Sequence, residues 1–158
     1  MQGRWLIAAM AAMALLTGCH RQRPAYGHFV HTPTAGWTAK DTLCYCVTLP
    51  AGTLPDKQRS DYRLELCLRS DSRYTRTGLT LQVVQQLDTV SRRRVAFPMS
   101  DKRGRSYGSG LAVRQQRRQL AIVSMSPEDT LRLRITPDIE PDNTLHGITD
   151  VGLLLTRR

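Results

Sequence analysis

Cysteine is the residue type in this chain best suited to covalent or metal chemistry. Cys44 and Cys46 point to the same side of an expected strand, where their Cα atoms would lie roughly 6.5–7 Å apart. A disulfide spans at most ~6.8 Å between Cα atoms, so these two residues should not bridge each other. Either one could bridge Cys67 if their strands are neighbours, and three reduced thiols are the alternative. No fourth metal ligand accompanies these three, and we expect neither a metal nor a cofactor.

Cys19 differs from the other cysteines because it closes the segment Leu16-Thr17-Gly18-Cys19. One charge, Arg4, and an apolar run from Trp5 to Leu16 precede it, as in a secretory signal. This run of 12 residues is shorter than the roughly 20 that span a membrane. The leucine at −3 and the small residues at −2 and −1 indicate a lipobox. We therefore expect residues 1–18 to be a signal peptide and Cys19 to carry the lipid anchor.

A lipobox is a bacterial signal, so the mature chain is expected in the cell envelope, anchored to the inner or the outer membrane. A run of acidic residues after the lipidated cysteine often directs such proteins to the cell surface. No such run follows Cys19. This absence favours a periplasm-facing protein.

The residue patterns of common enzymes are missing. The sequence has no Gly-x-Ser-x-Gly segment, and the stretch from Gly104 to Gly110 lacks the strand and helix that flank a phosphate-binding loop. The 13 acidic residues include no evident hydrolase pair. We therefore expect no catalytic residues.

The formal net charge is +10, and +9 once the signal peptide is removed. Such an excess suits nucleic acid, but export argues against that partner. Anionic lipid headgroups, lipopolysaccharide phosphates or an acidic protein are the expected partners, and a merely soluble arginine-rich surface is the alternative. Three basic clusters lie in or beside expected turns and would form a cationic edge if those turns meet. They comprise Arg92, Arg93, Arg94, Lys102, Arg103, Arg105, Arg114, Arg117 and Arg118.

Alternation of apolar and polar residues predicts about eight short strands. The clearest alternation runs from Tyr62 to Arg69. Further strands are expected at 41–48, 79–83, 90–97, 130–136 and 144–156, and a hairpin is expected to pair 110–113 with 120–125 around a turn at 114–119. No stretch has a helical period, so the pattern indicates an all-β antiparallel sandwich, with a barrel as the alternative. The expected domain spans residues 36–158, after a tether at 19–35.

The octet Leu145-His146-Gly147-Ile148-Thr149-Asp150-Val151-Gly152 resembles the closing motif of the gliding motility-associated lipoprotein GldH family of Bacteroidota. Gly36-Trp37, and Leu66-Cys67-Leu68-Arg69 followed by Tyr74, resemble earlier parts of that family, and the lipobox matches it too. Ser70-Asp71-Ser72 departs from the asparagines expected there, and the centre of the chain is unusually rich in arginine. The matching motif residues are Trp37, Arg69, Tyr74, Gly147, Asp150 and Gly152.

The resemblance implies an accessory lipoprotein of the gliding apparatus, linked to type IX secretion, with envelope proteins as partners. We expect a non-enzymatic assembly or scaffold component. A sandwich that binds glycan or lipopolysaccharide is the alternative, weakened because Trp37 and five tyrosines are the main aromatic residues left after export. From the residues alone, Gly147 and Gly152 indicate bulges or close backbone approach, and Asp150 indicates a hydrogen bond to a turn.

Overall fold

The structure is a computed structural model that describes residues 23–52 and 58–158. Ten strands make up most of the described chain. In chain order they are β1 (Tyr26–His31), β2 (Trp37–Thr38), β3 (Leu43–Thr48), β4 (Ser60–Ser70), β5 (Gly78–Gln86), β6 (Val90–Pro98), β7 (Arg114–Met125), β8 (Thr130–Pro137), β9 (Thr144–Leu145) and β10 (Ile148–Arg157). The expected signal peptide and Cys19 lie outside the described residues.

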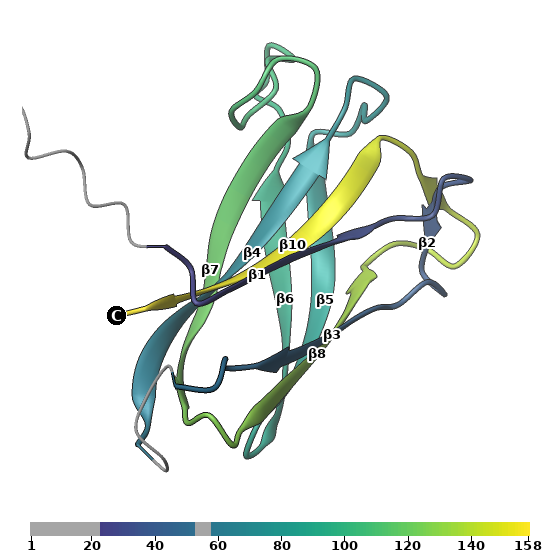
Figure 1. Cartoon of the computed structure of the whole chain (residues 1–158). Helices are drawn as coiled ribbons and strands as arrows, with labels where there is room; N and C mark the ends of the chain where they lie inside the picture. The colour runs from purple at the N-terminus through teal and green to yellow at the C-terminus, as the bar shows by residue number, and fades with distance from the viewer. Residues whose placement is uncertain (1–22, 53–57) are drawn as a thin grey trace, which may run out of the picture.

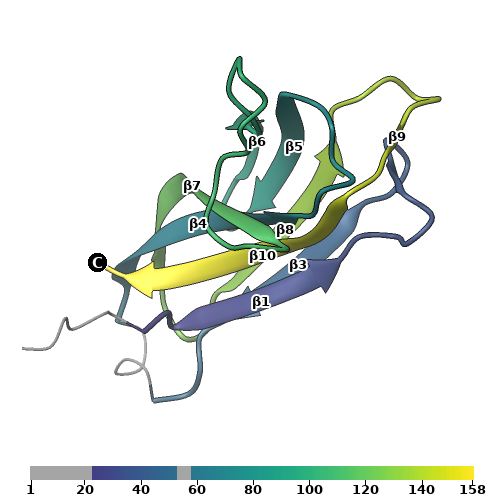
Figure 2. The same ribbon diagram turned by 90° about the horizontal axis from the view of Figure 1, so that it is seen from above.

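The strands form two four-stranded sheets that pack face to face (Figures 1 and 2). Sheet I has the order β1-β10-β4-β7, sheet II has the order β3-β8-β5-β6, and β2 pairs with β9 beside them. All pairs are antiparallel, and neither sheet closes on itself. The predicted antiparallel sandwich is therefore confirmed.

The core follows from the alternation along the strands. In β4, Tyr62, Leu64, Leu66 and Leu68 are buried, and they face similar residues of sheet II such as Leu133. Burying one such side chain contributes roughly 1.5–3 kcal/mol, so the shared core of the two inner faces dominates the stability of the fold. The outer faces carry most of the charged residues of the strands.

Strand β1 lies within the segment expected to be a tether. It pairs along its whole length with β10, from Tyr26 opposite Leu155 to His31 opposite Asp150. Its burial does not alternate, because an edge strand is only partly covered by the opposite sheet. The two-residue pattern that revealed the inner strands is therefore absent here, and the folded part begins ahead of residue 36.

Strand β7 corrects the expected hairpin. Residues 114–119, expected as a turn, are the first half of one continuous strand that pairs with β4. This half is polar because β7 is an edge strand with solvent on both sides of much of its length, so backbone pairing rather than side-chain burial holds it. The final strand is likewise split into β9 and β10 around Gly147, which has a φ of 82°.

The two ends of the sandwich differ. Tyr26, where the chain enters sheet I, is level with Leu155 and Leu64, whereas His31 is level with Asp150 and Arg69. At ~3.4 Å per residue these two levels are about 17 Å apart. Beyond the second level lie the turn at 70–77 and the loop at 99–113, which we call the loop end (Figure 1).

Candidate functional site

The basic charge of the chain is concentrated in one segment. Residues 90–125 comprise β6, the loop at 99–113 and β7, and they cross from sheet II to sheet I. This basic crossover contains all nine predicted interaction residues and only one acidic residue, Asp101, which gives it a net charge of +8 out of the chain's +10. Such a field attracts anionic partners and accelerates their association.

The crossover forms one side of the sandwich. Strands β6 and β7 are edge strands of different sheets, and the Arg93 guanidinium on β6 joins them by donating to the Leu120 carbonyl on β7. Only Lys102, Arg103 and Arg105 lie in a loop. The other six basic residues lie within β6 or β7. Arg92, Arg93, Arg94 and Arg114 are near the starts of these strands, beside turns, whereas Arg117 and Arg118 lie inside β7, and for these two the expected position in or beside a turn is wrong. The six residues form a basic side that runs the length of these strands.

Most of these charges lack an acidic partner. Arg94 pairs with Asp138 and Arg105 pairs with Asp101, and within the described residues the other seven have no ion pair. Hydrogen bonds from the backbone N–H and side chain of Arg105 hold the pKa of Asp101 below its usual range. Asp101 is therefore ionised at neutral pH and already engaged. Lys102, Arg103, Arg117 and Arg118 are exposed and remain open to an external anion.

A groove opens at the loop end between the 70–77 turn and the 99–113 loop, with a volume of about 610 Å³. Arg76, Lys102 and Arg114 line it. Leu111 at its rim is 98% exposed. Arg76 was not predicted as an interaction residue, although it lies in a polar connection, and this position was a usable signal.

Two of the family-motif residues, Gly147 and Tyr74, meet at the loop end, and a third, Trp37, lies in the core beside β9. Trp37 is fully buried and donates from Nε1 to the Asp41 carbonyl at 3.0 Å. A Cβ on Gly147 would lie 2.2 Å from the backbone nitrogen of Tyr74, so only glycine fits there. The Gly147 carbonyl accepts a hydrogen bond from the Asp71 N–H at 2.8 Å. The predicted close backbone approach is thus present at Gly147.

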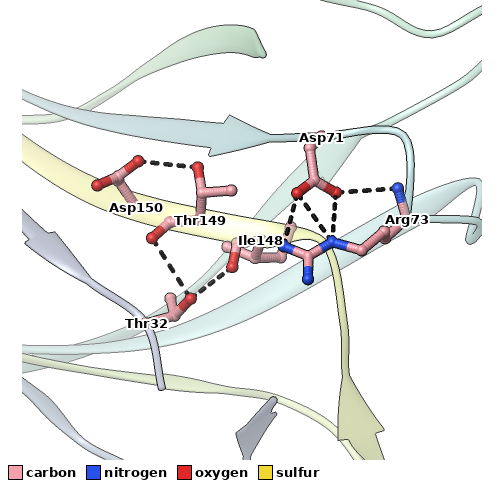
Figure 3. A network of polar contacts seen from close by, with 6 residues as sticks. All are labelled: Thr32, Asp71, Arg73, Ile148, Thr149 and Asp150. Atoms are coloured by element: carbon pink, nitrogen blue, oxygen red, sulfur yellow. Dashed lines mark hydrogen bonds and ion pairs between the residues drawn. The ribbon is translucent and has the colours of Figure 1, made fainter. Parts of the chain in front are cut away.

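Figure 3 shows the polar contacts around this approach. Arg73 and Asp71 form an ion pair at 2.7 Å, and the hydrogen bonds from Arg73 lower the pKa of Asp71. On the other side, Thr32 Oγ1 donates to the Ile148 carbonyl, which secures the end of β1 to the start of β10. The first pair stabilises the 70–77 turn and the second joins β1 to β10, and the hydrogen bond from the Asp71 N–H to the Gly147 carbonyl connects the turn to the start of β10.

The other three motif residues meet on the outer face of sheet I. Arg69 on β4 lies directly across from Asp150 on β10, and Gly152 lies across from Cys67. The ring of Phe29 lies over Gly152, where a Cβ would come within 2.4 Å of it. Asp150 accepts a hydrogen bond from its neighbour Thr149 at 2.8 Å and pairs with His31 at 2.5 Å. Both partners lie in strands, so among the described residues the predicted hydrogen bond from Asp150 to a turn is not formed. Phe29 and His31 were not predicted, because they lie in the expected tether.

The cysteines cannot form the disulfide that the sequence left open. Cys44 and Cys46 are exposed on the outer face of sheet II, whereas Cys67 is buried on the outer face of sheet I. The whole core separates them, and all three are free thiols. Burial raises the pKa of Cys67 to about 11, so this thiol stays protonated at neutral pH.

The described residues show no catalytic constellation that the sequence had missed. Within 23–52 and 58–158, no three His, Cys, Asp or Glu residues gather as a metal site. The same part of the chain contains no helix of the length and hydropathy needed to cross a membrane. The arrangement is suited to binding through charge, and the basic crossover is its main feature.

Comparison with known proteins supports the family resemblance. The model of the family described as GldH lipoprotein matches residues 25–155. The sequence matches no curated protein. Among solved structures, dimeric latent PorU from Porphyromonas gingivalis has 13% identity and a TM-score of 0.37, with 90% of this chain and 14% of that chain covered. The infectious bursal disease virus VP2 subviral particle has 9% identity and a TM-score of 0.31, with 87% and 34% covered. The chain thus spans a minor part of either.

Proposed function

Because the chain belongs to the GldH lipoprotein family, we propose that it is a lipid-anchored, non-enzymatic assembly component of the cell envelope. Its basic crossover binds an acidic protein partner, which we place among the gliding or type IX secretion components. The observation that carries this proposal is the net charge of +8 on residues 90–125. Seven of the nine basic side chains there lack an ion pair among the described residues.

The point at which the tether enters the fold favours a protein, rather than the anchoring membrane, as the partner of the basic crossover. The lipid anchor at Cys19 would precede Tyr26 by seven residues, which reach at most about 24 Å. Tyr26 lies at the end of sheet I that is away from the 99–113 loop. The 99–113 loop is therefore at the end of the fold opposite the point where the tether enters, which supports a partner further from that membrane.

The exposed side chains of the described residues do not favour the alternative, a sandwich that binds glycan. Sugar-binding faces use exposed aromatic rings, but Trp37 is fully buried in the core. On the basic crossover, Tyr107 is exposed, at 46%. A phosphorylated lipopolysaccharide would meet the charge of the crossover, and it is a separate outcome of the test.

The test is crosslinking in cells followed by purification of the tagged, lipidated protein from membranes. Arg117→Glu with Arg118→Glu reverses two unpaired charges on the crossover. Arg132→Glu with Arg134→Glu is the matched control, since it reverses two exposed charges on the outer face of sheet II. We expect the first variant to lose a protein partner that the wild type and the control retain.

The dependence of partner capture on salt concentration is a second test of binding through the basic crossover. Raising ionic strength from 0.1 M to 1 M shortens the screening length from about 10 Å to about 3 Å, so capture through exposed charges should weaken strongly. Capture that is insensitive to salt and unchanged in R117E/R118E would contradict the proposal. Recovery of lipopolysaccharide or glycan without a protein would also overturn it and would support the alternative.

A further inference from the structure

A second polar feature lies on the outer face of sheet I, at its loop end. A shallow hollow of about 400 Å³ is open to solvent there, and it is lined by Arg69, Ser109, Gly110, Val113, Gln115 and Asp150. The hollow contains one guanidinium and one carboxylate from neighbouring strands. How these two charges are already engaged determines what the hollow can bind.

Arg69 is held in place from two sides. The Phe29 ring crosses β10 over Gly152 and lies 3.9 Å from the guanidinium carbon of Arg69. The Nε of Arg69 donates to Gln115 Oε1 at 3.0 Å. These contacts fix the plane of the guanidinium, and its terminal amino groups donate to no other residue in the described part of the chain.

The nearest carboxylate does not neutralise Arg69. Asp150 is its direct cross-strand neighbour, yet one Asp150 oxygen contacts His31 Nδ1 at 2.5 Å and the other accepts from Thr149 Oγ1 at 2.8 Å. One oxygen is therefore engaged by His31 on β1 and the other by Thr149 on β10, and no ion pair joins Asp150 to Arg69 among the described residues. The result is a half-buried, oriented arginine with free donors.

We propose that this hollow is a carboxylate-binding site in which the terminal amino groups of Arg69 donate two parallel hydrogen bonds to the ligand. A planar guanidinium matches a carboxylate in this bidentate way, and an ammonium does not. The carboxylate can come from the C-terminus of a peptide or from an Asp or Glu side chain. The site goes beyond the proposed function, because one oriented arginine, rather than the summed charge of the crossover, does the binding.

The test uses the full-length lipidated protein in detergent and three fluorescent glycine peptides, measured by anisotropy. One peptide has a free C-terminal carboxylate, one is amidated, and one is amidated with a central aspartate. We expect the amidated glycine peptide to bind about tenfold more weakly than at least one of the other two. The tighter of the two carboxylate peptides identifies the source of the group.

Arg69→Lys keeps the positive charge but removes the two terminal amino groups that donate in parallel. We expect this variant to bind the preferred peptide about tenfold more weakly. The matched control is Arg63→Lys, on the same face of the same strand. Gln115→Ala leaves the guanidinium but removes its support, and it provides a second variant if R69K fails to fold. Equal affinity for all three peptides, or equal losses in R69K and R63K, would overturn the proposal.

The two proposals can fail separately. Lys102→Glu with Arg103→Glu reverses two exposed charges of the crossover that do not line the hollow, and this variant should keep the affinity ratio between the carboxylate and amide peptides if the hollow acts on its own. Loss of that ratio in K102E/R103E would assign carboxylate binding to the crossover and overturn the Arg69 site.

Discussion

At Gly152 the absence of a side chain determines the shape of the outer face of sheet I. The Phe29 ring occupies the space above this residue, and it covers the region where Cys67 is buried and Arg69 is oriented. A single methyl group at position 152 would meet the ring at 2.4 Å, closer than carbon atoms approach.

We predict that Gly152→Ala displaces Phe29 and lowers the free energy of unfolding by about 1–3 kcal/mol, as overpacking does. Chemical denaturation measures this change. Cys67 should also become reactive toward a thiol reagent, whereas in the wild type only the exposed Cys44 and Cys46 of the described thiols should react quickly. Gly78→Ala is the control, since its Cβ would meet nothing closer than 3.7 Å. An unaltered stability and a protected Cys67 in Gly152→Ala would refute this packing.

Alkaline pH is predicted to destabilise the fold. Burial raises the pKa of Cys67 to about 11 and that of Tyr74 to about 12, above their ordinary values of 9.0 and 10.0. Above pH 9 the unfolded chain loses these protons first, so unfolding is favoured increasingly as pH rises toward 11. Denaturation at a series of pH values should show this fall, and Cys67→Ala should make it shallower. A fall of the same steepness in Cys67→Ala would exclude the thiol as a cause.

At the scale of elements, β1 supplies a whole edge to sheet I although the sequence pattern placed it in a tether. We predict that a chain beginning at Ala25 melts like the mature protein, because β1 remains. A chain beginning at Thr32 should melt at a temperature about 10 °C lower or fail to fold, because the β10 backbone and part of the core lose their cover. Circular dichroism measures both. Equal melting temperatures would show that β1 is dispensable.

The two wrong predictions of secondary structure, a tether in place of β1 and a turn in place of the first half of β7, have a common physical cause. Strands β4, β5 and β8 lie inside the sheets, and the edge strand β3 has one face covered by the core. Apolar and polar residues therefore alternate along all four, and the sequence predicts them well. Strands β1 and β7 are edges of sheet I, and there backbone pairing replaces side-chain burial. Residues 114–119 are all polar and therefore looked like a turn. The reach of Phe29 over Gly152 depends on pairing between distant segments, which no local pattern contains.

At the scale of the whole molecule, the fold determines where the nine basic residues lie and therefore which surface can bind an anionic partner. The nine basic residues were visible in the sequence, but their separate positions suggested turns meeting at one end. Instead, the crossing from β6 to β7 places them along one side, from Arg93 beside Leu120, close to the level at which the chain enters sheet I, up to the loop end. Because the positive charge is concentrated on one side, the electrostatic field of the protein steers an acidic partner to that side.

Photo-crosslinking in living cells from two positions shows whether the partner binds at the basic crossover. A photoreactive residue replaces Tyr107, exposed in the loop of the basic crossover, or Glu128, exposed in the turn at the opposite end. We predict a discrete crosslinked protein from position 107 that is lost in R117E/R118E, and none from position 128. Crosslinks of equal yield from both positions, or from position 128 alone, would contradict binding through the crossover.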